Sequence, residues 1–228
     1  MGYTKQDFRS GDILYASQLN AMDNQIYENT NAIADLLYKP IQINTLVANP
    51  SQVEIGSIVN DVSLEFVMNK KPTSATLDGT AKTITTASGS INLTNLSYST
   101  NKTWTLVVTD ERGASSTKNA TLSFLNKAYW GTALSTPNIN RTFILSLGNS
   151  VLTTTKARTI NVNASTGEYI YYAIPSRFGA CTFTVGGFLG GINKISTFSF
   201  TNSSGYAENY DVYRSDNANL GTQTVVIS

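Results

Sequence analysis

Two rows of residues with a spacing of seven mark one stretch of the chain, residues 19–37. Rows of this kind form the seam of a coiled coil, where apolar side chains at heptad positions a and d pack against partner helices. Because so narrow a seam cannot be buried by one helix alone, the pattern predicts a helix over residues 17–39 that associates with other helices. We call the two rows the heptad face, and it comprises Leu19, Ile26 and Ile33 at a, and Met22, Asn29 and Leu36 at d.

The ends of this helix are predicted from single residues. The hydroxyl group of Ser17 can accept a hydrogen bond from a backbone N–H of the first turn, so Ser17 is the expected N-cap. Pro40 has no backbone N–H and disfavours the helical conformation at Lys39, so the helix is expected to end there. About three heptads of helix, roughly 30 Å in length, are only marginally stable in water without association.

Asn29 is the polar member of the heptad face. A buried amide costs free energy unless it is paired, and in a coiled coil its usual effect is to define the register and the oligomeric state. Residues 26–33, IYENTNAI, resemble the IxxNTxxI layer of trimeric coiled-coil stalks. The resemblance implies a homotrimer in which three Asn29 amides surround a chloride ion on the three-fold axis, with no other cofactor required. Two alternatives stay open, namely a lone helix with Asn29 facing solvent and a dimeric coiled coil.

From residue 41 to residue 126 the hydrophobic period changes from seven to two. Alternation of this kind is typical of strands that have one face in a core, and we expect Trp104 to anchor that core. Residues 77–79 and 110–113 predict hairpin turns with a glycine at positive φ. The apolar positions that alternate are Val62, Leu64, Phe66, Met68, Trp104, Leu106, Val108, Ala120, Leu122 and Phe124. Short strands at this spacing predict a small β-sandwich. The opening of the block at residues 49–56 and the hairpin at residues 104–124 resemble the immunoglobulin-like modules of bacteriophage virion proteins.

Residues 127–228 are predicted to form a second, C-terminal β-domain. The YWG sequence at residues 129–131 interrupts the alternation, so residues 126–136 are expected to be a junction. Apolar residues at every second position from 143 to 147 then predict a strand face. The chain as a whole is therefore expected to be mainly β, with one coiled-coil helix near its N-terminus.

Composition excludes several classes of partner. The 228 residues carry a formal net charge of +1, and 14% of them are charged. With no Lys/Arg cluster to follow a phosphate backbone, nucleic acid is not an expected partner. No apolar run approaches the roughly 20 residues of a membrane-spanning helix, so membrane insertion is not expected. The N-terminal residues lack the apolar core of a secretory signal, which predicts a cytosol-like compartment or release without such a signal.

The sequence offers little catalytic chemistry. It contains no histidine, the commonest general base and a common metal ligand, so a His-dependent triad is excluded. Cys181, the single cysteine, is expected to be a small buried apolar residue. Carboxylates cluster at residues 110–111 and 208–216, where we expect them to cap turns rather than cleave glycosides or bind calcium. The prediction is no enzymatic activity and no metal site.

Exposed aromatic rings can stack on sugars, and a few aromatic residues are candidates for this role. The alternative for each is that it fills a core or lies in a trimer interface. The candidate glycan contacts are Trp130, Tyr206, Tyr210 and Tyr213.

Two further regions resemble parts of bacteriophage fibre and appendage proteins. Residues 11–22, GDILYASQLNAM, resemble the GDxLxAxxLNAM-like string that opens the coiled coil of tail-fibre and baseplate-type proteins. Within the last hundred residues, the IPxRxG, FxVGGF and NYxVYRS elements resemble a C-terminal β-domain of phage tail and fibre proteins. The resemblance implies a virion structural protein that is assembled in the host cytoplasm.

On this resemblance the protein is a homotrimeric tail fibre or baseplate-type appendage that attaches to a glycan or protein of the host surface. A docking segment, residues 1–16, would bind other virion proteins through Phe8, Ile13 and Leu14, the alternative being a frayed terminus. Two alternatives apply to the whole protein. One is a head fibre or capsid-decorating protein, and the other is a tailspike that binds or cleaves glycans.

Overall fold

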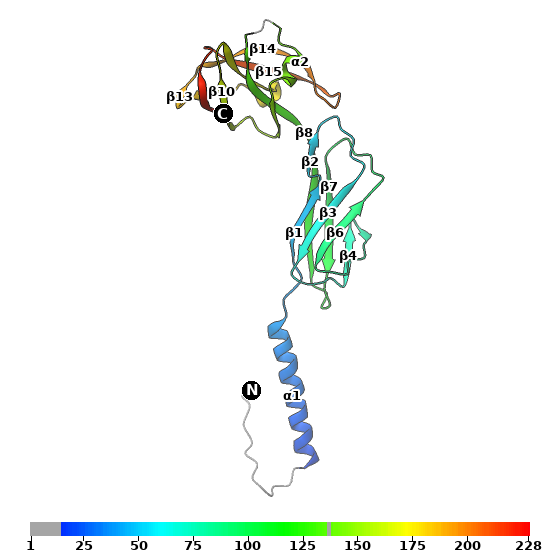
Figure 1. Ribbon diagram of the computed structural model, residues 1–228. Helices are drawn as coiled ribbons and strands as arrows, with labels where there is room; N and C mark the ends of the chain where they lie inside the picture. Colours follow the sequence, from blue (N-terminus) through cyan, green and yellow to red (C-terminus); the bar gives the residue numbers. More distant parts are fainter. Residues whose placement is uncertain (1–14, 136–137) are drawn as a thin grey trace. The chain divides into compact units, whose positions relative to one another are not determined.

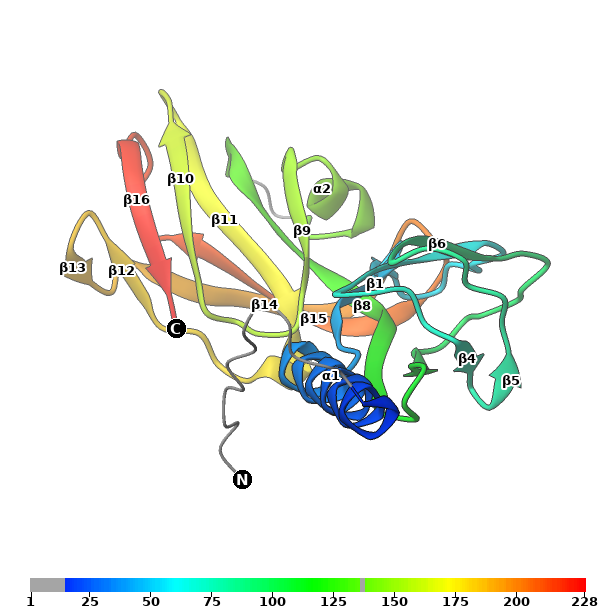
Figure 2. The ribbon, with the colours of Figure 1, turned by 90° about the horizontal axis from the view of Figure 1, so that it is seen from below.

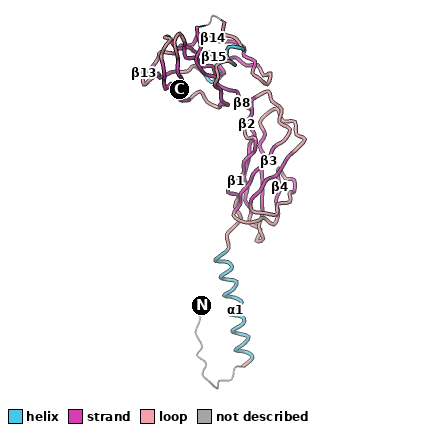
Figure 3. Tube along the Cα trace, in the orientation of Figure 1, coloured by secondary structure: helices cyan, strands magenta, loops and turns pink. Residues whose placement is uncertain are grey.

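The structure, a computed structural model, describes residues 15–135 and 138–228 and is mainly β. An α-helix, α1 (Ala16–Leu37), precedes a series of largely antiparallel sheets (Figures 1 and 3). The expected fold class is confirmed. The chain divides into two compact units, Met1–Pro40 and Ile41–Ser228. The predicted docking residues Phe8, Ile13 and Leu14 lie outside the described residues.

The first part of the second unit is an immunoglobulin-like β-sandwich. Its strands are β1 (Ile43–Asn49), β2 (Gln52–Glu54), β3 (Val62–Met68), β4 (Ser74–Leu77), β5 (Thr80–Ala81), β6 (Ser88–Leu93), β7 (Lys102–Thr109) and the first half of β8 (Ser115–Leu134). One sheet has the order β1-β3-β6, and the other the order β8-β7-β4-β5. β1 pairs with β3, whereas β2 pairs in parallel with β8, so the start of the domain contributes a strand to each sheet.

The alternating apolar residues meet in one core between these two sheets. Along β3, β7 and β8 buried residues alternate with more exposed neighbours, as the period of two predicts. Trp104, the predicted anchor, is only 2% exposed, and its ring meets that of Tyr98 edge-on at 5.7 Å between centroids. The predicted turn at residues 77–79 joins β4 to β5, with Gly79 at φ 79°.

The predicted turn between β7 and β8 is also present, and Asp110 organises it. The Asp110 carboxylate accepts hydrogen bonds from the backbone N–H groups of Arg112 and Ala114, each at 3.0 Å. It also accepts one from the backbone N–H of Ile41 at 3.1 Å. Gly113 takes φ 82°. As expected, this carboxylate caps backbone amides, and it ties the first residue of the sandwich to the β7–β8 turn.

β8 is one continuous strand of 20 residues that runs from the sandwich into the C-terminal half (Figure 1). The segment interpreted as a junction is therefore strand as far as Leu134, and the predicted boundary between residues 126 and 127 falls inside β8. The YWG interruption has another cause. A Cβ on Gly131 would lie 1.8 Å from the carbonyl oxygen of Leu147. Only glycine allows the following segment to cross the strand so closely.

The C-terminal half is a second sandwich. Its elements after β8 are α2 (Arg141–Leu145), β9 (Asn149–Thr153), β10 (Arg158–Ala164), β11 (Glu168–Pro175), η1 (Ser176–Phe178), β12 (Phe183–Val185), β13 (Phe188–Leu189), β14 (Ile192–Thr201), β15 (Ala207–Ser215) and β16 (Gly221–Ile227). One sheet has the order β14-β15-β11-β8, and the other the order β10-β16-β12-β13. β9 pairs with β8 beside this path.

The strand predicted at residues 143–147 is wrong, because this segment contains the short helix α2. The Asn140 side chain caps it by accepting a hydrogen bond from the backbone N–H of Phe143 at 3.0 Å. Ile144 and Leu147, three residues apart, are the buried pair. This is the spacing of one helical face, which a period of two cannot produce.

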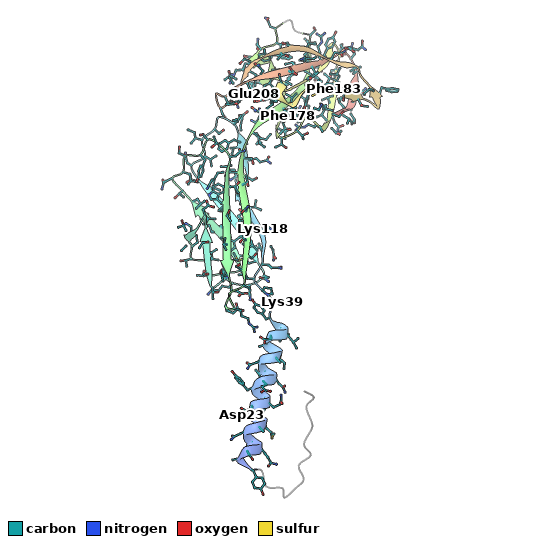
Figure 4. The ribbon with its side chains drawn as sticks, turned by 180° about the vertical axis from the view of Figure 1, so that it is seen from behind. Asp23, Lys39, Lys118, Phe178, Phe183 and Glu208 are labelled. Atoms are coloured by element: carbon teal, nitrogen blue, oxygen red, sulfur yellow. The ribbon has the colours of Figure 1, made fainter. Side chains whose placement is uncertain are left out.

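The sheet β14-β15-β11-β8 is apolar on both faces. One face packs against the β10-β16-β12-β13 sheet, and Phe183 lies in this core (Figure 4). The other face carries Tyr171, Phe200 and Tyr210, which α2 and its flanking residues help to cover. Each face thus has its own core, and the central strand β11 is buried on both sides.

Candidate functional site

The candidate site is the heptad face of α1. The helix begins one residue after its N-cap, Tyr15, so Ser17 lies inside the first turn and its assignment as N-cap is wrong. Instead, the backbone N–H of Tyr15 donates a hydrogen bond to the side-chain oxygen of Gln18 at 3.0 Å. At the other end Tyr38 is extended, with ψ 130°. The helix therefore stops before Pro40, as its lack of an N–H predicts.

The heptad face is exposed to solvent along the whole helix. Of the described residues of α1, none is buried. The exposed fractions of the apolar members, Leu19, Met22, Ile26, Ile33 and Leu36, range from 45% to 85%. An isolated helix of this length has little stability in water, because most helical stability in proteins comes from packing of an apolar face.

Charge pairing does not replace that packing. The residues of α1 include the acids Asp23, Glu28 and Asp35 and no Lys or Arg, so no ion pair can form within the helix. Asp23 extends from the helix in Figure 4. The stability of helix α1 must therefore come from covering the heptad face.

Asn29 lies on the exposed heptad face, and its side chain is hydrogen-bonded within its own helix. The Gln25 side-chain Nε2 donates a hydrogen bond to Asn29 Oδ1 at 3.0 Å. That bond engages the acceptor half of the amide, whereas an anion would be held by the donor half, Nδ2. The neighbouring hydroxyl of Thr30 donates to the carbonyl oxygen of Ile26 in its own helix at 2.8 Å. The chloride ion at the Asn29 layer stays a prediction from the sequence.

Two of the four candidate glycan contacts are wrong because they are buried. Tyr210 is 1% exposed and Tyr213 is 3% exposed, so neither ring can stack on a sugar. The Tyr210 hydroxyl donates a hydrogen bond to the carbonyl oxygen of Lys127 at 2.8 Å. The Tyr213 hydroxyl accepts one from the backbone N–H of Cys181 at 3.0 Å, and burial raises the pKa of Tyr213 to about 12. Both are core residues with satisfied hydroxyl groups.

The other two candidates are more open. Trp130 is half-buried against the C-terminal core, and the Arg158 guanidinium lies 5.4 Å from the centroid of its ring. The Arg158 guanidinium therefore covers a face of the Trp130 ring on which a sugar would stack. Tyr206 is 38% exposed, and its backbone N–H is held by the Asn202 side chain at 2.9 Å. Tyr206 therefore has the most accessible ring of the four.

Of the carboxylates clustered at residues 208–216, Glu208 and Asp211 lie on strand β15 and not in a turn, which corrects the expectation for these two. Asp216 lies in the bend that follows β15. Glu208 pairs with Arg177 and accepts a hydrogen bond from Asn126 Nδ2 at 2.5 Å. Asp216 accepts one from Asn193 Nδ2 at 2.8 Å. Figure 4 labels Glu208 in this half of the molecule. Each group is engaged by its neighbours.

Asp211 is the most deeply buried of these carboxylates, at 5% exposed. Its carboxylate accepts hydrogen bonds from the hydroxyl groups of Thr197 at 2.6 Å and Ser176 at 2.9 Å. The Lys194 ammonium lies 3.5 Å away. Burial acts to raise the pKa of Asp211, but these partners outweigh it and the pKa is lowered. The group is a satisfied anion within the strand, not a proton donor at neutral pH.

Other chemical features are sparse. Burial raises the pKa of the Cys181 thiol, which is half-buried against the C-terminal core. Across residues 15–135 and 138–228, His, Cys, Asp and Glu side chains do not gather in threes around a point that could hold a metal ion. Within the same residues no helix combines the length and apolar character needed to cross a bilayer.

Sequence reasoning missed Asn202, which joins the two sandwiches. This side chain is 2% exposed, and its Nδ2 donates to the carbonyl oxygen of Ile55 at 2.7 Å. Its Oδ1 accepts from the backbone N–H groups of Ser204 at 3.0 Å and Tyr206 at 2.9 Å. The hydroxyl groups of Ser57 and Ser204 are 3.0 Å apart. No local pattern signals the two bonds between the sandwiches, because their partners are 147 residues apart.

Neither protein-family models nor curated proteins match the sequence. Among solved structures, the fold is similar to the eight N-terminal immunoglobulin domains of Down syndrome cell adhesion molecule (TM-score 0.24, 10% identity, 81% of this chain and 26% of that one). It is also similar to a Streptomyces avermitilis α-L-rhamnosidase complexed with L-rhamnose (TM-score 0.23, 11% identity, 82% of this chain and 23% of that one). A third similar structure is that of a 1.5-MDa bacterial ice-binding adhesin (TM-score 0.23, 15% identity, 83% of this chain and 63% of that one). The chain spans about a quarter of the first two structures and less than two thirds of the third, and similarity this distant carries no functional argument.

Proposed function

We propose that the protein is a non-enzymatic structural protein of a bacteriophage virion. It is a homotrimeric short fibre or appendage of the tail-fibre or baseplate type, and its β-domains attach to the host surface. One observation carries the proposal. The helix α1 has 22 residues, a heptad face exposed along its whole length, and no buried residue. Three such helices cover one another. The resemblance of the Asn29 layer to that of trimeric stalks favours three copies over two.

Trimerisation explains how such a protein attaches firmly without an elaborate binding site. Three copies of a weak contact become strong once the first has formed, because the others then bind at a high effective concentration. The β-domains supply that contact. Among the four candidate glycan contacts, Tyr206 is the most open to a host glycan, at 38% exposed, and a host protein is the alternative target.

The remaining parts of the proposal follow the sequence resemblance. The N-terminal segment docks to other virion proteins, and three Asn29 amides hold a chloride ion on the three-fold axis. A head fibre or capsid-decorating protein would use the same parts at another place in the virion. A glycan-cleaving tailspike has less support, because Glu208 and Asp211 are both held by neighbouring side chains.

The first test is the mass of the intact full-length protein at micromolar concentration, measured under native conditions. We expect three chains, whereas a monomer would overturn the proposal. Ile26→Asp, which places a charge in the seam, should give monomers. Asn31→Asp adds the same charge two residues after the Asn29 layer, off the heptad face, and should remain trimeric. Labelled antibody should then locate the protein on intact particles, and its absence from them would refute the virion assignment.

A further inference from the structure

The turn between β14 and β15 contacts the first sandwich. We call it the latch turn, residues 202–206, and it lies against residues 54–57, which end β2 and follow it. Figures 1 and 2 show the β14–β15 hairpin in orange. The buried cores of the two sandwiches share no residue, and the chain itself crosses between them along β8. Domains with separate cores are expected to move relative to each other unless a specific contact holds them.

Asn202 forms the centre of that contact. Its Nδ2 donates a hydrogen bond to the carbonyl oxygen of Ile55 at 2.7 Å, and its Oδ1 accepts from the backbone N–H groups of Ser204 and Tyr206. One side chain therefore fixes both the shape of the latch turn and its bond to the first sandwich. Because Asn202 is 2% exposed, water does not compete for these bonds.

The backbones also fit closely at Gly56. This residue has φ 93°, and a Cβ on it would lie 2.9 Å from the Cβ of Tyr206 and 3.0 Å from the carbonyl oxygen of Ser204. Both the conformation and the space therefore require glycine at this position. The fit is a second observation, independent of the hydrogen bonds, that the latch turn is seated on the first sandwich.

Glu54 adds a polar contact beside the latch turn. Its side chain is 9% exposed, although it carries a carboxylate. It accepts hydrogen bonds from the hydroxyl groups of Ser204 at 3.4 Å and Tyr129 at 3.3 Å. The Lys127 ammonium lies 3.5 Å away. All three partners belong to the C-terminal half, so this carboxylate of the first sandwich depends on the second sandwich for its partners.

The latch turn is held firmly to its own sandwich. Phe200, two residues before it, is fully buried in the core that α2 covers. The Arg141 Nε of α2 donates a hydrogen bond to the carbonyl oxygen of Thr201 at 2.8 Å. The latch turn therefore cannot stay on the first sandwich while the second sandwich swings away.

We propose that the latch turn holds the two sandwiches at a fixed angle, so that they unfold as one cooperative unit despite their separate cores. Without it, β8 and its short pairing with β2 would leave a joint that bends. The contact does not depend on the proposed trimer, because every bond in it lies within one chain. In the proposed attachment function, a fixed joint would reduce the freedom that binding to the host must remove.

The two tryptophans allow a direct test, because each sandwich contains one of them. In a Trp104→Phe background of the full-length chain, fluorescence reports only on Trp130 in the second sandwich. Val108→Ala then weakens the core of the first sandwich, where Val108 is fully buried. We expect this distant change to lower the urea midpoint reported by Trp130 by roughly 0.5–1 M. Leu64→Ala, in the same core, should lower it further.

Asn202→Asp removes the contact while preserving the turn. The aspartate keeps an oxygen for the N–H groups of Ser204 and Tyr206, but it sets a second oxygen against the carbonyl of Ile55. Ser203→Asp is the matched control, since it adds the same charge to an exposed residue of the same turn. With Asn202→Asp, the Trp130 midpoint should no longer respond to the change in the first core. With Ser203→Asp, the response should persist.

Each outcome decides the proposal. If Val108→Ala leaves the Trp130 midpoint unchanged in the chain with an intact latch turn, the sandwiches unfold independently and the proposal is overturned. An equal response with and without Asn202→Asp would show that β8 alone couples them, which overturns the role of the latch turn. Gly56→Ala removes the fit from the side of the first sandwich and should act as Asn202→Asp does. A monomeric native mass would overturn the proposed trimer and leave this contact intact.

Discussion

Replacement of Asn29 by isoleucine tests the seam most directly. The residue occupies a d position of the heptad face, and its amide oxygen already accepts a hydrogen bond from Gln25 at 3.0 Å. In a single chain position 29 is exposed, so any burial of the new side chain comes from assembly. Asn29→Ile should therefore strengthen the trimer while weakening the preference for one register and one oligomeric state.

The magnitude follows from burial and from lost hydrogen bonds. Burying one isoleucine side chain contributes about 1.5–3 kcal/mol. Each buried Asn hydrogen bond that is lost removes about 0.5–1.5 kcal/mol. Over three chains the net gain is centred on about 3–4 kcal/mol per trimer, which lowers the dissociation constant by about 100- to 1,000-fold. Because that constant scales with the square of concentration, the midpoint falls by about 10- to 30-fold.

Sedimentation equilibrium over nanomolar to micromolar concentrations measures this midpoint. Asn31→Ile is the matched control, since it has the same change of side chain and the same helix propensity two residues away, off the heptad face. It should leave the midpoint unchanged. We also expect a minor population of another oligomeric state for Asn29→Ile. If both variants behave alike, or if Asn29→Ile unfolds the protein without changing its assembly, Asn29 does not lie in a seam.

Four further outcomes are expected. Trp104→Ala should destabilise the first sandwich by about 3–5 kcal/mol in thermal unfolding, and Trp104→Phe by less; equal losses would contradict its role as anchor. Gly131→Ala should cost more than the roughly 1–2 kcal/mol expected of Gly113→Ala, because only the former meets a backbone oxygen, that of Leu147; the reverse order would refute the close crossing. The folded-state pKa of Asp211 lies below the usual aspartate value of 3.8, so the stabilising contribution of the carboxylate is present above that pH and is lost as pH falls through the folded-state pKa. Asp211→Asn should therefore lower stability by about 1–3 kcal/mol at pH 7 and flatten the acid loss below about pH 4, in urea unfolding at both pH values. Finally, sodium chloride should stabilise the trimer more than sodium acetate of equal ionic strength if chloride binds at the axis, whereas equal effects would indicate only screening of the acidic helices.

The predictable features were those set by neighbouring residues. The hydrophobic period of two predicted the strands of the first sandwich, and glycine predicted its turns, where Gly79 and Gly113 have positive φ. The same local reasoning failed at α2, because apolar residues at every position from 143 to 145 fit either period. It also failed for Tyr210 and Tyr213. β15 is covered on both faces, so its aromatic residues alternate between two cores instead of between a core and solvent. No local sequence pattern predicts that the Asn202 side chain bonds to Ile55 in the first sandwich.

The distribution of cores explains why assembly and display can be separate. The buried clusters of the β-domains draw on residues 41–227, whereas the described residues of α1 contribute none. In the proposed trimer, the β-domains keep their stability on dilution, while α1 depends on its partner helices and so on protein concentration. On the proposed function, a change to a loop that contacts the host would alter affinity but not the number of associated chains, and a change in the heptad face would alter that number but not the contact. Such a division lets binding surfaces diverge quickly while the multiplicity that makes weak contacts effective is retained.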